Sequence, residues 1–120
     1  MNQINETFYK TLNQERASFI LKKVKEFKGD ENRFKAEARR VSSLIISNGL
    51  LPTLAFLKSK EERKPVYDII AQWLKHKGLC KNDALEELLN SDAVKLRLAT
   101  MEALELANWL KRIVEIEIRE

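Results

Sequence analysis

The feature that most constrains the fold of this chain is the spacing of its apolar residues, which follows the period of an α-helix. The strongest case lies between Pro65 and Gly78, where apolar residues recur at i, i+3, i+4, i+7 and i+8: Val66, Ile69, Ile70, Trp73 and Leu74. This spacing places all five side chains on one helical face. A second face is predicted by a spacing of i, i+4, i+7 and i+11, carried by Phe34, Ala38, Val41 and Ile45.

Helix boundaries divide the rest of the chain in the same way. We expect helices over about residues 5–27 and 33–47, a short one with Pro52 in its first turn, one from Pro65 to Gly78, a short one from residues 82–83, and a last one over residues 93–118. Asp30 or Asn32 and Ser91-Asp92 are suitable N-caps. No segment requires a strand. The prediction is an all-α fold: one domain over residues 1–120, a single compact bundle of about five to six helices with a long C-terminal helix.

The last of these helices has an unusual distribution of apolar residues, which spread around much of its circumference. They are Val94, Leu98, Met101, Leu104, Trp109, Leu110, Ile113 and Ile116. A helix that is apolar on most sides is either central in a bundle or covered by a partner. The closing IVEIEI alternates with the period of a strand, but it continues a long helical pattern, so we predict helix there.

Composition excludes most catalytic chemistry. His76 and Cys80 are the sole histidine and cysteine, too few for a Cys/His zinc site, and the three glycines are isolated, so there is no phosphate-binding loop. No apolar run is long enough to span a membrane, and the first residues lack the apolar stretch of a signal peptide. We expect a cytoplasmic binding or assembly protein that is not an enzyme and uses no cofactor, metal or small-molecule substrate.

Charge is divided unevenly along the chain. Residues 1–81 hold 17 Lys/Arg against 9 Asp/Glu, whereas residues 82–120 hold 5 against 9. A basic body with an acidic C-terminal segment favours contact with a polyanion. It also allows neighbouring copies to meet basic face to acidic face. The net charge of +4 is equally compatible with a purely solubilising role.

Three stretches of the sequence resemble the small subunit of the type III-B CRISPR RNA-targeting effector, the Cmr complex. They are Leu12–Ala17 (LNQERA), Leu44–Lys60 (LIISNGLLPTLAFLKSK) and Arg97–Ile113. The second is the most specific, since it joins a helix end, an Asn-Gly-Leu turn and a Leu-Ala-Phe-Leu helix. Residues 79–92 carry no such resemblance, so no role is assigned to them.

The resemblance implies a small all-helical protein without catalytic activity of its own. In that family several copies stack head to tail into a minor filament beside the backbone filament that holds the guide RNA. The partners implied are therefore other subunits of the effector, copies of the chain itself, and guide or target RNA, in antiviral defence. Cleavage of the target belongs to the backbone subunit.

A filament subunit that does not read sequence should contact phosphates, because phosphates occur at every position. The candidate RNA-binding residues are Arg16, Arg39, Arg40, Lys58, Lys60, Arg97 and Arg112. Tyr9 and Tyr67 are candidates for base stacking. Five of these cations also have an alternative role: Arg16 and Arg97 as internal ion-pair partners, Arg112 as a partner of Glu105 or Glu115, and Lys58 and Lys60 as solvated surface residues.

Two other functions are compatible with the sequence. One is a structural adaptor whose apolar last helix docks a partner without touching nucleic acid. The other is a small helix-turn-helix DNA-binding regulator, with its turn around Asn48-Gly49. A recognition helix should offer polar side chains to base edges, whereas Leu54, Phe56 and Leu57 are apolar.

Overall fold

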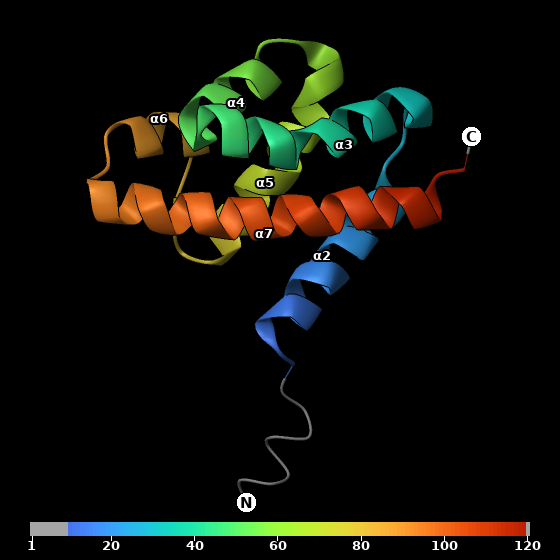
Figure 1. Cartoon of the computed structure of the whole chain (residues 1–120), viewed down its shortest axis with the longest axis horizontal. Helices are drawn as coiled ribbons and strands as arrows, with labels where there is room; N and C mark the ends of the chain where they lie inside the picture. The colour runs from blue at the N-terminus through green and yellow to red at the C-terminus, as the bar shows by residue number, and fades with distance from the viewer. Residues whose placement is uncertain (1–9, 120) are drawn as a thin grey trace, which may run out of the picture.

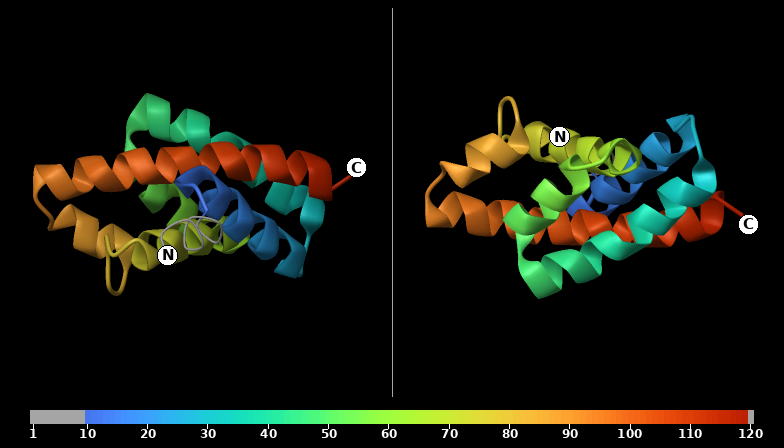
Figure 2. Two further views of the ribbon diagram at one scale, coloured as in Figure 1. Left: turned by 90° about the horizontal axis from the view of Figure 1, so that it is seen from below. Right: turned by 90° about the horizontal axis from the view of Figure 1, so that it is seen from above.

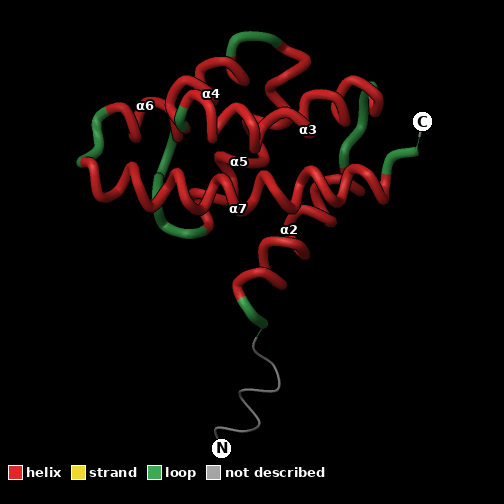
Figure 3. The backbone as a smooth tube through the Cα atoms, viewed as in Figure 1, coloured by secondary structure: helices red, strands yellow, loops and turns green. Residues whose placement is uncertain are grey.

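Helices account for nearly all of the chain that the structure covers. The computed structural model describes residues 10–119, which contain six α-helices, one short 3-10 helix and no strand. The elements in chain order are α2 (Leu12–Glu26), α3 (Glu31–Asn48), α4 (Leu50–Lys58), the 3-10 helix η1 (Glu61–Arg63), α5 (Lys64–His76), α6 (Ala84–Leu89) and α7 (Ala93–Glu117). Figures 1 and 3 show this arrangement, and it confirms the predicted all-α fold with a long last helix.

Short polar side chains fix where the helices begin. Asp30, Asp83 and Asp92 cap α3, α6 and α7, each accepting a hydrogen bond from the backbone amide three residues later. Thr11 and Gln14 form a reciprocal capping box at the start of α2. Because each cap satisfies an amide that the helix itself leaves unpaired, these residues also set the helix boundaries.

The centre of the fold is an antiparallel pair formed by α3 and α7. Figure 1 shows the two running side by side in opposite directions, and side-chain contacts join Lys35 to Ile118 and Arg39 to Glu115. On the face that α7 buries, three alanines recur every four residues, at Ala99, Ala103 and Ala107. These small side chains let the helices that cover α7 approach its backbone closely.

The remaining helices close the core around this pair. In Figure 2, α2 and α5 lie on one side of α7 and α3 lies on the other. The short α4 packs against both α3 and α5. The predicted core faces of α3 and α5 are confirmed, since all nine residues named for them are buried. Trp73 is the largest fully buried side chain, at 1 % exposure.

The structure departs from the predicted pattern in two places. Residues 60–64 are a charged run whose composition predicts a solvated connector, but they contain η1 and the first residue of α5. On α7, the buried positions are mostly alanines and leucines, whereas Val94, Leu98, Met101 and Ile116 are 51–61 % exposed. The helix therefore lies at the centre of the fold but is not covered all round, because one of its faces stays exposed. Tyr9, a candidate for base stacking, lies outside the described residues.

No helix in the described range is both long and apolar enough to cross a membrane.

Candidate nucleic-acid interface

The best candidate for contact with a phosphate backbone is a cluster of cations around the ring of Phe56. Arg63 lies flat against this half-buried ring, with its Cζ 3.8 Å from the ring centroid, and the Arg40 Cζ lies 5.3 Å from the same centroid. Arg40 comes from α3, Phe56 from α4 and Arg63 from η1. Three elements therefore meet at one aromatic side chain, hereafter the Phe56 cluster.

One carboxylate holds both arginines of the Phe56 cluster in place. Glu37, which is only 5 % exposed, accepts a hydrogen bond of 2.9 Å from Arg40 Nη1 and one of 3.0 Å from Arg63 Nε. The burial of Glu37 against apolar neighbours requires this compensation, because an unpaired buried charge is strongly destabilising. Two positive charges share one negative charge, so the cluster keeps a net positive charge.

Lys60 adds a further cation beside this cluster. Its backbone carbonyl accepts the hydrogen bond from the Arg63 amide, at 3.0 Å, and it stands directly before η1. The side chain is exposed, and no hydrogen bond or ion pair joins it to any residue of the described range. Arg40 is also half exposed at its side chain. Arg40, Lys60 and Arg63 together can therefore present several N–H donors to solvent.

Lys58 is held in a different way. Its Nζ lies 2.8 Å from Asp83 Oδ1 and 5.4 Å from the ring centroid of Tyr67. The Tyr67 hydroxyl donates to the same carboxylate oxygen at 2.7 Å. Hydrogen bonds from Lys58, the Glu86 amide and Tyr67 lower the pKa of Asp83 to about 2, against the opposing effect of burial. Burial raises the pKa of Tyr67 to about 12. Both Lys58 and the predicted stacking residue Tyr67 bind the same carboxylate of the chain, that of Asp83.

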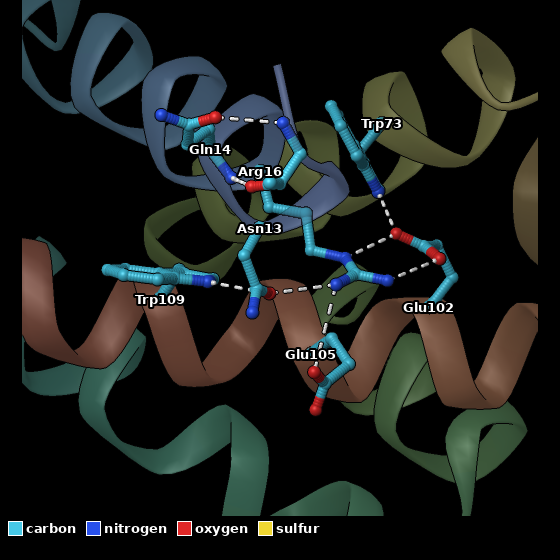
Figure 4. Close-up of polar contacts among 8 residues, drawn as sticks. Asn13, Gln14, Arg16, Trp73, Glu102, Glu105 and Trp109 are labelled. Atoms are coloured by element: carbon cyan, nitrogen blue, oxygen red, sulfur yellow. Dashed lines mark hydrogen bonds and ion pairs between the residues drawn. The ribbon is translucent and has the colours of Figure 1, made fainter.

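Arg16 lies inside the protein, in the network shown in Figure 4. Its guanidinium forms a two-pronged pair with Glu102, from Nε to Oε1 at 2.7 Å and from Nη2 to Oε2 at 3.0 Å. Trp73 Nε1 donates to Glu102 Oε1 at 2.8 Å, and Asn13 Oδ1 accepts from Arg16 Nη1 at 2.9 Å. The hydrogen bond from Arg16 lowers the pKa of Glu102. With Arg16 only 8 % exposed, this network fastens α2 to α5 and α7.

The other predicted cations are spread over the surface. Arg39 pairs with Glu115 through both prongs of its guanidinium, with Nη2 3.0 Å from Oε2. Arg112 is exposed, with its Cζ 6.0 Å from the ring centroid of Trp109. Arg97 is exposed on α7, and no hydrogen bond or ion pair joins it to the described part of the chain. Of the seven predicted residues, the structure thus brings Arg40 into the Phe56 cluster and places Lys60 next to it in the chain, three residues before Arg63, and it leaves the others apart.

Arg63 is not among the predicted residues, because the run Lys60-Glu61-Glu62-Arg63-Lys64 has the composition of a solvated connector. The sequence does indicate that some cation is needed beside Glu37. Glu37 stands three residues after Phe34, on the flank of the predicted core face, and a carboxylate placed there requires a cation.

The geometry supports neither a metal site nor a role for α4 in reading DNA bases. His76 is exposed and Cys80 is buried, and no group of three or more possible metal ligands occurs within residues 10–119. On α4, Leu54 and Leu57 are buried, and the exposed side chains are Pro52, Ala55 and Lys58. That surface offers one polar side chain to a base edge, and Asp83 already binds it.

Comparisons with known proteins support the resemblance inferred from the sequence. The chain is 32% identical over 111 residues to the CRISPR system Cmr subunit Cmr5 of Thermotoga maritima, an alignment that covers 89% of this chain and 84% of that protein. The fold is similar to the crystal structure of a CRISPR-associated Cmr5 family protein from Thermus thermophilus, with a TM-score of 0.80 and 27% identity over 92% of this chain and 100% of that one. The family model described as CRISPR-associated protein (Cas_Cmr5) matches residues 12–117. This chain therefore belongs to the Cmr5 family, the small subunits of the type III-B CRISPR effector.

Proposed function

We propose that this Cmr5 family protein is a non-catalytic subunit that stacks with copies of itself into a minor filament and helps to hold target RNA through exposed cations. The observation that carries the RNA-binding part is the Phe56 cluster, where Glu37 compensates only one of two arginines. Lys60 stands beside it without a carboxylate partner in the described range. Such donors suit the phosphates of a strand whose sequence varies.

The expected affinity of a single copy is low. If one subunit neutralises about three phosphates, the slope of log K against log salt for a single strand is about −2. A fourfold rise in salt then weakens binding by about tenfold to twentyfold. Strong binding therefore depends on several copies acting together along a filament.

The test replaces Arg40 and Lys60, the two exposed cations at the Phe56 cluster. Glu37 keeps its hydrogen bond from Arg63 in this variant. The variant is Arg40→Gln with Lys60→Gln, and its RNA binding is compared with that of the unmodified chain by fluorescence anisotropy, first alone and then with the sister subunits added. Loss of two phosphate contacts should lower the salt slope by about 1.4 and weaken binding by about tenfold near physiological salt. Lys58 is a poorer test position, because Lys58→Glu would place a carboxylate against Asp83.

The matched control removes the same charge elsewhere. Lys10 and Lys75 are exposed, and neither forms an ion pair within the described part of the chain. Lys10→Gln with Lys75→Gln should leave the RNA affinity within about twofold. Equal losses in the two variants at matched salt would refute the assignment to the Phe56 cluster.

A second candidate function is that of an adaptor that makes no contact with nucleic acid. It is favoured by Arg16 and Arg39, two candidates whose guanidiniums are each held by two prongs to a carboxylate of the same chain. If this function is the correct one, the chain joins the sister subunits normally and Arg40→Gln with Lys60→Gln leaves the RNA affinity of the assembly unchanged.

A further inference from the structure

The N-terminal half of α7 carries an apolar face that nothing in the described chain covers. Val94, Leu98 and Met101 follow one another at i, i+4 and i+7, and they are 61, 51 and 60 % exposed. Leu89, at the end of α6, is 60 % exposed as well. We call Val94, Leu98 and Met101 the α7 apolar face. Exposed apolar side chains grouped in this way indicate a surface that another protein covers.

The charge beside this face indicates what kind of surface would cover it. Residues 82–92 contain four carboxylates (Asp83, Glu86, Glu87 and Asp92) and no Lys or Arg. They line a groove of about 610 Å³ together with Lys95, and Asp83 is also paired with Lys58, which is not among the lining residues. Residues 93–120 hold five Lys/Arg and five Asp/Glu, so the negative charge of the C-terminal segment is concentrated in this groove.

A negative groove repels a phosphate backbone and attracts a cationic protein surface. The chain itself carries such a surface. Apart from the buried Arg16, residues 10–28, which include α2, hold five Lys and two Asp/Glu. Lys22, Lys25 and Lys28 are exposed or half-buried there, and no ion pair joins them to the described part of the chain. Their aliphatic stems can lie over apolar side chains while the ammonium groups reach carboxylates.

The two surfaces lie toward opposite ends of the molecule. Figures 1 and 2 place α6 and the start of α7 at one end, and the connection from α2 to α3, where Lys28 lies, at the other. The molecule is 50 Å long in its longest direction. A contact between two different patches at opposite ends does not close into a symmetric dimer, so it can propagate from copy to copy.

We propose that the α7 apolar face and its acidic groove are the docking surface for the lysines of α2 from a second copy of this chain. This inference rests on the stacking in the proposed function, and it assigns a role to residues 82–92, which the sequence resemblance left without one. The contact has a direction: each copy accepts through α6 and α7 and donates through α2. Because charge pairing contributes to it, it weakens as salt rises.

The test uses two variants of the full chain, each blocked at one surface. Leu98→Lys with Glu86→Lys blocks the accepting surface, and Lys22→Glu with Lys25→Glu blocks the donating surface. Self-association is measured by sedimentation velocity without RNA, at millimolar protein and low ionic strength. Ile46→Lys is the matched control, since Ile46 is 72 % exposed on a different helix, α3. Circular dichroism checks that each variant is folded.

The unmodified chain and Ile46→Lys should form salt-sensitive oligomers, and each blocked variant should associate at least about tenfold more weakly. An equimolar mixture of the two blocked variants should form pairs and nothing longer, because one intact contact remains between unlike copies. A monomeric unmodified chain, or blocked variants that associate like the control, would overturn the proposal. So would binding of a sister subunit by the α7 apolar face without self-association. Every variant keeps Arg40 and Lys60, so RNA binding can persist when this proposal fails.

Discussion

Two arginine sites of this protein use the same chemistry to different ends. At Arg16, one guanidinium donates two hydrogen bonds to Glu102 and one to Asn13, and a second carboxylate, that of Glu105, lies 3.7 Å away. At the Phe56 cluster, two guanidiniums meet a single carboxylate, Glu37. The first site is saturated and buried, whereas the second keeps charge and donors in contact with solvent.

The difference between the sites lies in the ratio of charges and in exposure, not in residue type. A saturated pair removes both charges from any role outside the fold, and its value lies in joining α2 to α7. An unsaturated cluster keeps its arginines oriented and leaves them able to bind an anion. Substitutions should therefore change stability at the first site and RNA binding at the second.

The largest expected effect follows from Glu102→Ala. Arg16 is left buried without its carboxylate, and Trp73 loses the acceptor of its indole N–H, so the free energy of unfolding should fall by about 3 kcal/mol. Urea denaturation measures it. Glu105 is the control, because its side chain is 50 % exposed and 3.7 Å from Arg16, and Glu105→Ala should cost less than about 0.5 kcal/mol. Equal losses of stability in Glu102→Ala and Glu105→Ala would show that the buried and the exposed carboxylate contribute equally.

Arg63→Ala tests how much the Phe56 cluster contributes to the stability of the fold. It removes the guanidinium stacked on Phe56 and one of the two hydrogen bonds to Glu37, so a loss of about 1.5 kcal/mol is expected in the same assay. Lys64→Ala provides the comparison, since the Lys64–Glu61 pair is exposed and its loss should leave the free energy of unfolding almost unchanged. A loss as large as that of Glu102→Ala would mean that the cluster is primarily a structural lock.

A smaller effect is expected from Asp83→Asn, and it depends on pH. The folded pKa of Asp83, about 2, lies below its ordinary value of 3.8, so its contribution is fully present above pH 3.8 and is lost as the pH falls through about 2. The variant should be about 1 kcal/mol less stable at neutral pH. The gap between the two proteins should close in acid, and urea denaturation at several pH values measures it. A gap that stays constant with pH would contradict the ion pair with Lys58.

The smallest effect on stability is expected from Arg40→Ala. Glu37 keeps Arg63, so unfolding should change by less than about 0.5 kcal/mol, while RNA affinity falls and the salt slope drops by about 0.7. Arg33→Ala is the control, because Arg33 also forms an exposed pair, with Glu62, and its loss should leave RNA affinity unchanged. Anisotropy titrations at several salt concentrations separate the two variants.

Local structure was largely predictable from the sequence, because it depends on residues close together in the chain. The spacing of Val66 to Leu74 places the buried face of α5, and Asp30 and Asp92 mark the starts of α3 and α7. The helical assignment of the alternating IVEIEI segment is confirmed up to Glu117.

Pairing across the fold was not predictable in the same way. Arg16 and Glu102 are 86 positions apart, and Arg63 is 26 positions from Glu37. No local pattern reports which of many carboxylates a given arginine meets. The bare side of α7 was also hidden, because alanines fill the buried side and leave Val94 and Leu98 outside. Which cations bind RNA remains a prediction.

The buried carboxylate of Glu37 has a consequence for how a strand would be received. A long arginine side chain free in solution loses rotamer entropy when it grips a phosphate. Here Glu37 and the ring of Phe56 have already restricted Arg40 and Arg63 during folding. Every copy has the same Glu37 and Phe56, so successive subunits would hold their two arginines in the same orientation. Little further ordering of these side chains would be needed when an RNA strand binds.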